Sequence, residues 1–166
     1  MLQAGLHNLR QASVRITEVS PRDGLQHESE FVPTLRKISL INALSRTGVA
    51  EIEASSFVSP AAIPQLADSD EVLRAIDRIP GVTYSALVPN ERGLERARAA
   101  GVDKIAVFTA ASNSFTRHNI KATVQESLVR FRPIVAAAKR DGMAVRAYLS
   151  TVVFCPYEGR VPPTQV

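Results

Sequence analysis

The sequence contains a single cysteine, Cys155, and no long apolar run. One cysteine cannot form an internal disulfide, and such scarcity is typical of a reducing compartment. No stretch approaches the roughly 20 apolar residues that a membrane-spanning helix requires, so no integral membrane segment is predicted. These absences favour a cytoplasmic protein, with the mitochondrial matrix as the alternative.

Runs of one charge sign and low-complexity segments are also missing. Lys and Arg total 20 against 16 Asp and Glu, which gives a net charge of +4. Because basic and acidic residues are interleaved, this surplus favours an anionic small-molecule ligand over a nucleic-acid or membrane partner. With 45% hydrophobic residues, residues 1–166 are predicted to form one globular domain. Residues 1–13 lack the length and serine content of a mitochondrial presequence and are expected to fray.

One pattern recurs along the chain: a polar helical stretch, a glycine, and then a short β-branched or apolar run. A glycine just past a helix readily adopts the left-handed conformation that ends the helix. Together with the opening run 14–19, the pattern predicts five strands that alternate with helices, the last over 144–153. Such alternation implies parallel strands joined by right-handed crossovers. The glycines are Gly48, Gly81, Gly101 and Gly142.

The predicted helices have support of their own. Asn90 follows Pro89 at the end of the third strand, where it can cap a helix that begins near Glu91. Apolar residues recur at helical spacing in two further segments: Leu35, Ile38, Ile41 and Leu44, and then Val124, Leu128, Phe131 and Val135.

Two architectures accommodate five parallel strands. A doubly wound sheet would be complete in this length, whereas an eight-stranded TIM barrel typically needs about 250 residues. However, no helical pattern follows the fifth strand, although a finished parallel sheet is covered on both faces. We therefore predict an α/β fold, an incomplete TIM (β/α)8 barrel of about five parallel strands.

Polar side chains gather where these strands end. Arg22 and Asp23 follow the first strand, and Glu53 lies near the end of the second. Tyr148 and Ser150 lie in the fifth strand. In both architectures, ligands bind beyond the carboxyl ends of parallel strands, so a functional site is predicted at this edge.

The strand-end motifs carry a resemblance to the hydroxymethylglutaryl-CoA lyase family, which belongs to a superfamily of metal-dependent TIM-barrel lyases, synthases and carboxyltransferases. An Arg-Asp-Gly motif alone indicates only the superfamily. The longer Pro-Arg-Asp-Gly-Leu-Gln, joined to Ser-Phe-Val-Ser-Pro, is specific to the lyase group. The resemblance covers the chain from about Val14 onward. Its motifs are EVSPRDGLQ at 18–26, IEASSFVSP at 52–60, FTAAS at 108–112 and CPYEG at 155–159.

The resemblance implies roles for the two charged residues after the first strand. The resemblance implies that Asp23 is a ligand of a divalent metal, Mg²⁺ or Mn²⁺, because both ions bind carboxylate oxygens well. The alternative is a turn aspartate in an Asx hydrogen bond. It makes Arg22 the cation that stabilises the enolate formed when a carbon–carbon bond breaks. The alternative is a solvated surface arginine.

Glu53 shares strand parity with an apolar residue, Val49, so its carboxylate is predicted to need a cationic or hydrogen-bonding partner. Arg22 is the predicted partner, and Glu53 is predicted to orient this catalytic residue rather than to act as a base. Glu51 has the same parity, but no partner is predicted for it. Cys155 is predicted to pack, because the resemblance implies a reactive cysteine on a later glycine-rich loop.

Four further residues are predicted to contact the substrate, although hydroxyls at strand ends also serve as caps. They are Gln26, Ser56, Tyr148 and Ser150, in addition to Arg22.

The resemblance implies a lyase that cleaves 3-hydroxy-3-methylglutaryl-CoA by metal-assisted retro-Claisen chemistry, in leucine catabolism and ketone-body formation. The implied His-x-His pair, asparagine ligand and glycine-rich loop have no match here, so the chain alone is expected to be inactive. The alternatives are a related Claisen-type synthase, for isopropylmalate or homocitrate, and a non-catalytic acyl-CoA-binding domain. Unpaired sheet edges favour a homo-oligomer.

Overall fold

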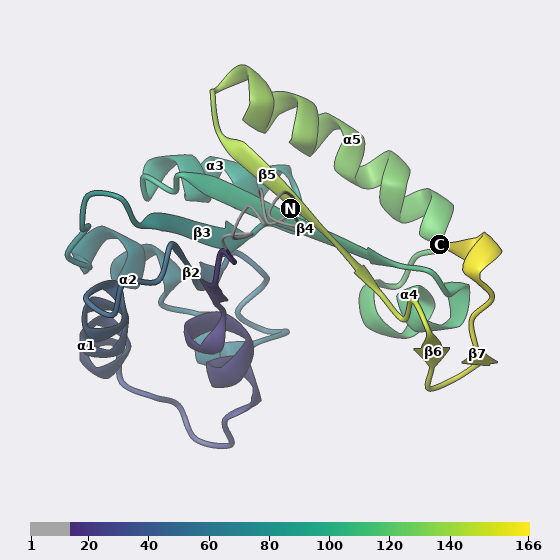
Figure 1. The fold of residues 1–166 in the computed structure, drawn as a ribbon, viewed down its shortest axis with the longest axis horizontal. Helices are drawn as coiled ribbons and strands as arrows, with labels where there is room; N and C mark the ends of the chain where they lie inside the picture. Colours follow the sequence, from purple (N-terminus) through teal and green to yellow (C-terminus); the bar gives the residue numbers. More distant parts are fainter. Residues whose placement is uncertain (1–13) are drawn as a thin grey trace, which may run out of the picture.

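The computed structural model describes residues 14–166, so the predicted frayed segment 1–13 lies outside the described residues. In chain order the elements are β1 (Thr17–Glu18), η1 (Ser20–Gly24), η2 (Leu25–His27), α1 (Thr34–Ser45), β2 (Glu51–Ser56), η3 (Pro64–Leu66), α2 (Ser69–Ala75), β3 (Thr83–Leu87), α3 (Glu91–Ala99), β4 (Lys104–Ala110), α4 (Asn113–Ile120), α5 (Val124–Arg140), β5 (Ala144–Ser150), β6 (Phe154–Cys155), β7 (Gly159–Arg160) and η4 (Pro163–Gln165) (Figure 1).

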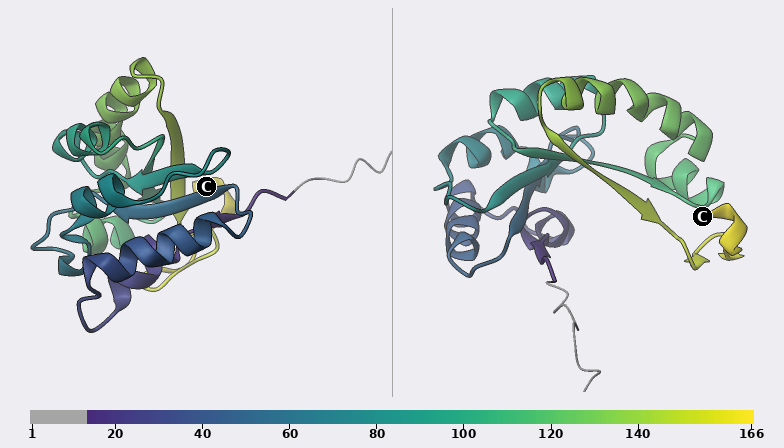
Figure 2. Two further views of the ribbon diagram at one scale, coloured as in Figure 1. Left: turned by 90° about the vertical axis from the view of Figure 1, so that its left-hand side faces the viewer. Right: turned by 45° about the horizontal axis from the view of Figure 1, so that its top comes forward.

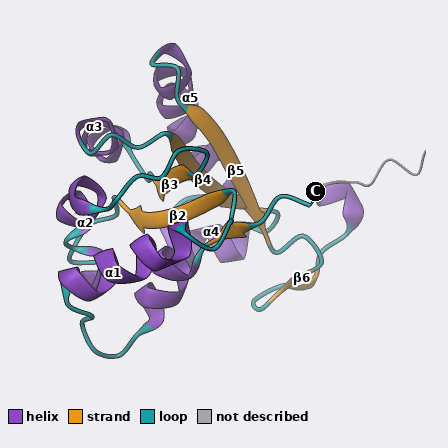
Figure 3. Ribbon diagram, turned by 60° about the vertical axis from the view of Figure 1, so that its left-hand side comes forward, coloured by secondary structure: helices purple, strands orange, loops and turns teal. Residues whose placement is uncertain are grey.

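Strands β1 to β5 form one parallel sheet in chain order. The sheet curls into a half-barrel, with α1, α2, α3 and α5 along its convex side (Figure 2, right; Figure 3). This confirms the predicted incomplete barrel of alternating strands and helices. Two strands are shorter than predicted. β1 spans only two residues of the run 14–19, and β5 ends at Ser150 because Thr151, with φ of 57°, leaves the extended region.

Most of the local signals that separate helices from strands are present as predicted, but α2 ends at Ala75 and an extended backbone at Ile76 separates it from Gly81. The four glycines that precede strands all have left-handed backbones, with φ between 67° at Gly101 and 90° at Gly81. The Asn90 side chain accepts a hydrogen bond from the Gly93 N–H at 2.8 Å and so caps α3. The start of this helix near Glu91 is therefore confirmed.

The apolar core lies between the sheet and the convex layer of helices. Ile52 and Ile105 from the sheet, Ile41 from α1 and Ile134 from α5 are at most 1% exposed and belong to one cluster. Of the apolar residues predicted at helical spacing, Leu35 and Leu128 are exposed. Other residues of α1 and α5 form the buried face of each helix. The opposite, concave face carries buried polar side chains.

A short antiparallel hairpin of β6 and β7 follows the sheet. Cys155 in this hairpin is fully buried, and its Sγ lies 2.9 Å from the Ser112 Oγ, which confirms that it packs. Among residues 14–166, no helix combines the length and apolar character needed to cross a membrane.

Candidate active site

A cavity of about 930 Å³ lies beyond the carboxyl ends of the parallel strands. Its walls come from the segments after β1, β2 and β3, from the last residues of β4 and β5, and from α4 and α5. The structure brings most of the predicted site residues together here. Those that line the cavity are Arg22, Asp23, Gln26, Tyr148 and Ser150.

The wide helical turn η1 places Arg22 at the cavity wall. The Val19 carbonyl accepts the N–H groups of Arg22 at 3.1 Å and of Asp23 at 2.7 Å, which folds the chain sharply after β1. The Arg22 side chain is only 13% exposed. Its Nε donates to Glu53 Oε1, and its Nη1 donates to Asp23 Oδ1 at 2.7 Å. The predicted pairing of Arg22 with Glu53 is confirmed.

Glu53 receives a second donor on its other carboxylate oxygen. The Tyr148 hydroxyl donates to Glu53 Oε2 at 2.6 Å. Burial, together with this hydrogen bond, raises the pKa of Tyr148 above its ordinary value, so the phenol remains a protonated donor at neutral pH. Glu53 itself is fully buried and does not line the cavity. This geometry suits an orienting group rather than one that meets substrate.

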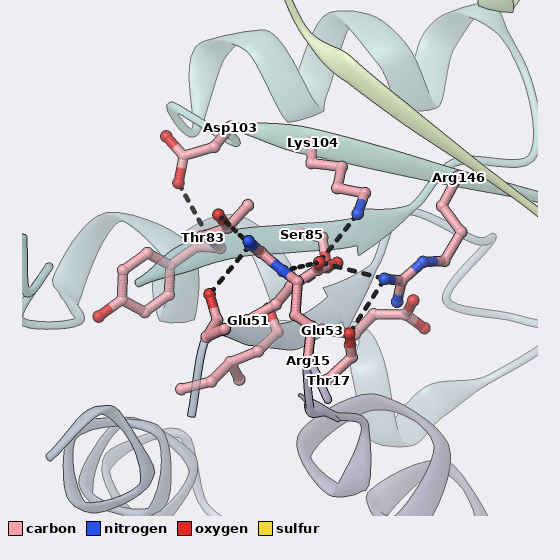
Figure 4. A network of polar contacts seen from close by, with 12 residues as sticks. Arg15, Thr17, Glu51, Glu53, Thr83, Ser85, Asp103, Lys104 and Arg146 are labelled. Atoms are coloured by element: carbon pink, nitrogen blue, oxygen red, sulfur yellow. Dashed lines mark hydrogen bonds and ion pairs between the residues drawn. The ribbon is translucent and has the colours of Figure 1, made fainter. Parts of the chain in front are cut away.

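Glu51, for which no partner is predicted from the sequence, lies at the centre of a cationic cluster on the concave face. Its Oε2 accepts from Lys104 Nζ at 2.8 Å and from Arg146 Nη2 at 3.2 Å, and the Arg15 Nε lies 4.0 Å away. The Ser85 hydroxyl donates to Oε1 at 3.1 Å. Figure 4 shows these side chains converging on the one carboxylate.

Ser56 is the one predicted pocket residue that the structure does not bring to the cavity. It is 1% exposed, and its hydroxyl donates to the Leu87 carbonyl at 3.4 Å and accepts the Val58 N–H at 3.3 Å. The sheet register shifts between Glu53 and Ser55, and this irregularity changes which residues at the end of β2 face inward.

Sequence reasoning also missed part of the cavity wall. Phe108 carried a usable signal, because it begins the FTAAS run near the end of β4. Asn119 on α4 and Arg130 on α5 also line the cavity, but each lies within a helix whose polar residues give no sign of which ones turn toward a ligand.

The described residues offer one candidate metal ligand rather than a complete site. Asp23 is half-exposed at the cavity wall, and its carboxylate is paired with Arg22. Mg²⁺ takes about six oxygen ligands, yet residues 14–166 contain no group of three or more His, Cys, Asp or Glu side chains able to hold an ion. The residues between 14 and 166 therefore do not form a metal site on their own.

The HMGL-like family profile matches residues 13–166, which include every element of the half-barrel and every residue of the site. The chain belongs to the HMGL-like family. Among its relatives, the mitochondrial hydroxymethylglutaryl-CoA lyase of Bos taurus is 51% identical over 153 residues, which are 92% of this chain and 47% of the bovine one. This HMGL-like chain thus spans about half the length of the curated relatives that it matches.

Solved structures agree with this family membership. An HMG-CoA lyase from Brucella melitensis superposes with a TM-score of 0.90 at 55% identity, over 92% of this chain and 54% of the other. An HMG-CoA lyase from Acenitobacter baumannii, in complex with coenzyme A and 3-methylmalate, superposes with a TM-score of 0.86 at 39% identity, over 91% and 49% of the two chains. The half-barrel of this HMGL-like chain is therefore shared with HMG-CoA lyases.

Proposed function

We propose that this chain is the N-terminal part of a lyase that cleaves 3-hydroxy-3-methylglutaryl-CoA to acetoacetate and acetyl-CoA. The observation that carries the proposal is the Arg22 guanidinium, held at the wall of a 930 Å³ cavity by a buried carboxylate. The similarity to proteins described as hydroxymethylglutaryl-CoA lyases, at 51% identity for the bovine protein, supports this choice of reaction.

Arg22 suits the charge that develops in this cleavage. Breaking the bond between C2 and C3 of the acyl group leaves its electron pair on C2, and the resulting enolate places negative charge on the thioester oxygen. The C3 hydroxyl gives up its proton and becomes the ketone of acetoacetate, and C2 accepts a proton to form acetyl-CoA. Among residues 14–166, partners are found for Nε and Nη1 of Arg22, which leaves Nη2 to donate to the enolate oxygen.

The neighbouring residues divide the remaining tasks. We propose that Glu53 orients Arg22, that Gln26, Tyr148 and Ser150 contact the acyl group or the pantetheine, and that Ser56 supports the end of β2. A carboxylate oxygen of Asp23 would contribute to a site for Mg²⁺ or Mn²⁺ whose other ligands come from outside the described residues. The proposed ligand is an acyl-CoA, in line with the coenzyme A bound to the Acenitobacter baumannii lyase.

Assembly and location are also proposals. Among residues 14–166, β1 and β5 are the two outer strands of the sheet, and outer strands favour pairing with further chain, within one polypeptide or in a homo-oligomer. The curated relatives include mitochondrial and cytoplasmic lyases, and the single buried cysteine is compatible with either reducing compartment.

The experiment is an Arg22→Gln substitution in a full-length lyase that carries this sequence. Removing one preorganised donor to an oxyanion typically lowers kcat by about 10²–10³-fold, and we expect at least that loss, measured as acetoacetate and acetyl-CoA released from 3-hydroxy-3-methylglutaryl-CoA. The matched control is Arg46→Gln, because the Arg46 side chain is 60% exposed and lies outside the cavity. Turnover by Arg22→Gln equal to that of the control would refute the role of Arg22.

Two measurements together separate the other functions: titration of the 166-residue chain with the acyl-CoA, with and without Mg²⁺, and a turnover assay of the full-length protein. Binding of the acyl-CoA by the chain, without any turnover by the full-length protein, would favour the non-catalytic domain. Condensation of acetyl-CoA with a 2-oxo acid, without cleavage of the thioester substrate, would favour a synthase.

A further inference from the structure

A continuous line of polar contacts joins the buried Glu51 to Arg22. Arg146 donates from Nη2 to Glu51 and from Nη1 to the Tyr148 hydroxyl, at 3.2 and 3.4 Å. Tyr148 donates to Glu53, and Glu53 accepts from Arg22. The line crosses from β2 to β5, returns to β2 and ends on η1. Glu51 and Arg146 lie outside the cavity lining, whereas Tyr148 and Arg22 lie within it.

Arg146 is the residue that makes this line continuous. Its planar guanidinium presents separate donors in a fixed fork, so one side chain reaches both Glu51 and Tyr148 and also donates to Thr17 Oγ1 at 3.0 Å. The hydrogen bond with Tyr148, reinforced by the Glu51 charge, raises the pKa of Arg146 above its ordinary value. A lysine ammonium could keep the charge but could not span the two acceptors with one rigid group.

The charge of Glu51 determines which carboxylate the Arg146 guanidinium contacts. The negative charges of Glu51 and Glu53 both attract the Arg146 guanidinium. The Lys104 ammonium on β4 pairs with the fully buried Glu51 carboxylate. Without the Glu51 charge, Lys104 would repel Arg146 and Glu53 would be its remaining carboxylate. Arg146 would then compete with Arg22 for the carboxylate that orients Arg22.

We propose that Glu51 and Arg146 are positioning residues for Arg22 and act through Tyr148 and Glu53. The consequence for catalysis rests on the lyase function proposed above, but the consequence for the Arg22 side chain does not. Glu51→Gln and Arg146→Lys should each leave the fold in place while releasing Arg22 from its fixed orientation.

The first test is NMR of the Arg22 Nε–H group in the 166-residue chain, assigned by its disappearance in Arg22→Lys. This N–H donates to a fully buried carboxylate, so it should exchange slowly with water. We expect the protected signal to be lost in Glu51→Gln and in Arg146→Lys, and to persist in the control Asp77→Asn, which removes the partner of the exposed Arg46. If Arg146→Lys keeps the wild-type signal, Arg146 supplies only charge and the proposal is overturned.

The second test is steady-state kinetics of the same variants in a full-length lyase. A small misplacement of a catalytic group can cost about 10²-fold in rate, and we expect kcat to fall by about 10-fold or more with KM within about twofold. Wild-type kcat in a folded Glu51→Gln variant would overturn the proposal while leaving the lyase function intact. Absence of cleavage in wild type, together with loss of the Arg22 signal in the variants, would instead refute the function and retain the positioning.

Discussion

The contact between Arg22 and Glu53 should be strongly coupled energetically, because water is largely excluded from it. The Glu53 side chain is 0% exposed and that of Arg22 is 13% exposed. Opposite charges 4 Å apart attract by about 4 kcal/mol at an effective dielectric constant of 20, and by about 1 kcal/mol in water. Desolvation and the other partners of each group reduce the first figure, so we expect a coupling of about 2 kcal/mol.

A double-mutant cycle measures this coupling. Arg22→Gln, Glu53→Gln and the double variant are unfolded with urea, and the free energy of unfolding is obtained from far-UV circular dichroism. Each single variant leaves one charge without its main partner, and we expect a loss of about 3 kcal/mol, the lower end of the range for broken buried pairs. The double variant should lose less than the two singles together.

The chain supplies a matched control in Arg46 and Asp77, which are 60% and 63% exposed and lie 3.1 Å apart. Exposed pairs of this kind couple by about 0.2–1 kcal/mol. Raising the salt concentration should weaken the control pair and leave the buried pair nearly unchanged. A coupling for Arg22 and Glu53 no larger than that of the control would show that solvent screens the site and that Glu53 does not fix Arg22.

Three further outcomes are expected. Hydrogen bonds from Ser114 hold the pKa of Glu158 below its ordinary value of 4.5, so the contact between the hairpin and α4 should persist above pH 4.5 and be lost as the pH falls through the lower folded-state pKa. A midpoint at or above 4.5 for the Ser114 amide signal would contradict this. Asn90→Ala removes the cap of α3 and should cost about 1 kcal/mol in urea unfolding. Gly93→Ala places a Cβ 3.2 Å from the Phe57 carbonyl oxygen. The overpacking should cost about 2 kcal/mol, more than the helix-propensity gain of about 1 kcal/mol, so we expect the variant to be less stable in urea unfolding. A stabilised variant would refute this.

The alternation of strands and helices could be predicted because its signals are local. Gly101 and Gly142 follow the ends of α3 and α5 in a backbone conformation that other residues adopt at a cost, and the Asn90 side chain caps α3 through the N–H of Gly93, three residues later. The pairing of Arg22 with Glu53 was also accessible, because parity along β2 and the edge rule for parallel strands bring these two side chains together.

The partners of Glu51 could not be predicted because they depend on strand register. Lys104 lies on β4 and Arg146 on β5, and the stagger between strands aligns Ser85 with Lys104 and Ala106 with Arg146. No residue pattern within a single strand encodes that stagger. The misplacement of Ser56 has the same origin, since the register shift after Glu53 interrupts strict alternation.

Glu51 and Glu53 lie on the same face of β2, but their hydrogen-bonding partners differ. Glu51 is paired with Lys104 and Arg146, which lie outside the cavity lining, so in the proposed arrangement it acts on Arg22 only through Arg146, Tyr148 and Glu53. Glu53 is bonded to two residues that line the cavity, Arg22 and Tyr148. Because a strand holds its side chains more rigidly than a turn does, a guanidinium on η1 gains a fixed direction from a carboxylate on β2. Among residues 14–166, the contacts of Arg22 with Glu53 and Asp23 are formed without a ligand, so this part of the site should be preorganised before a ligand binds.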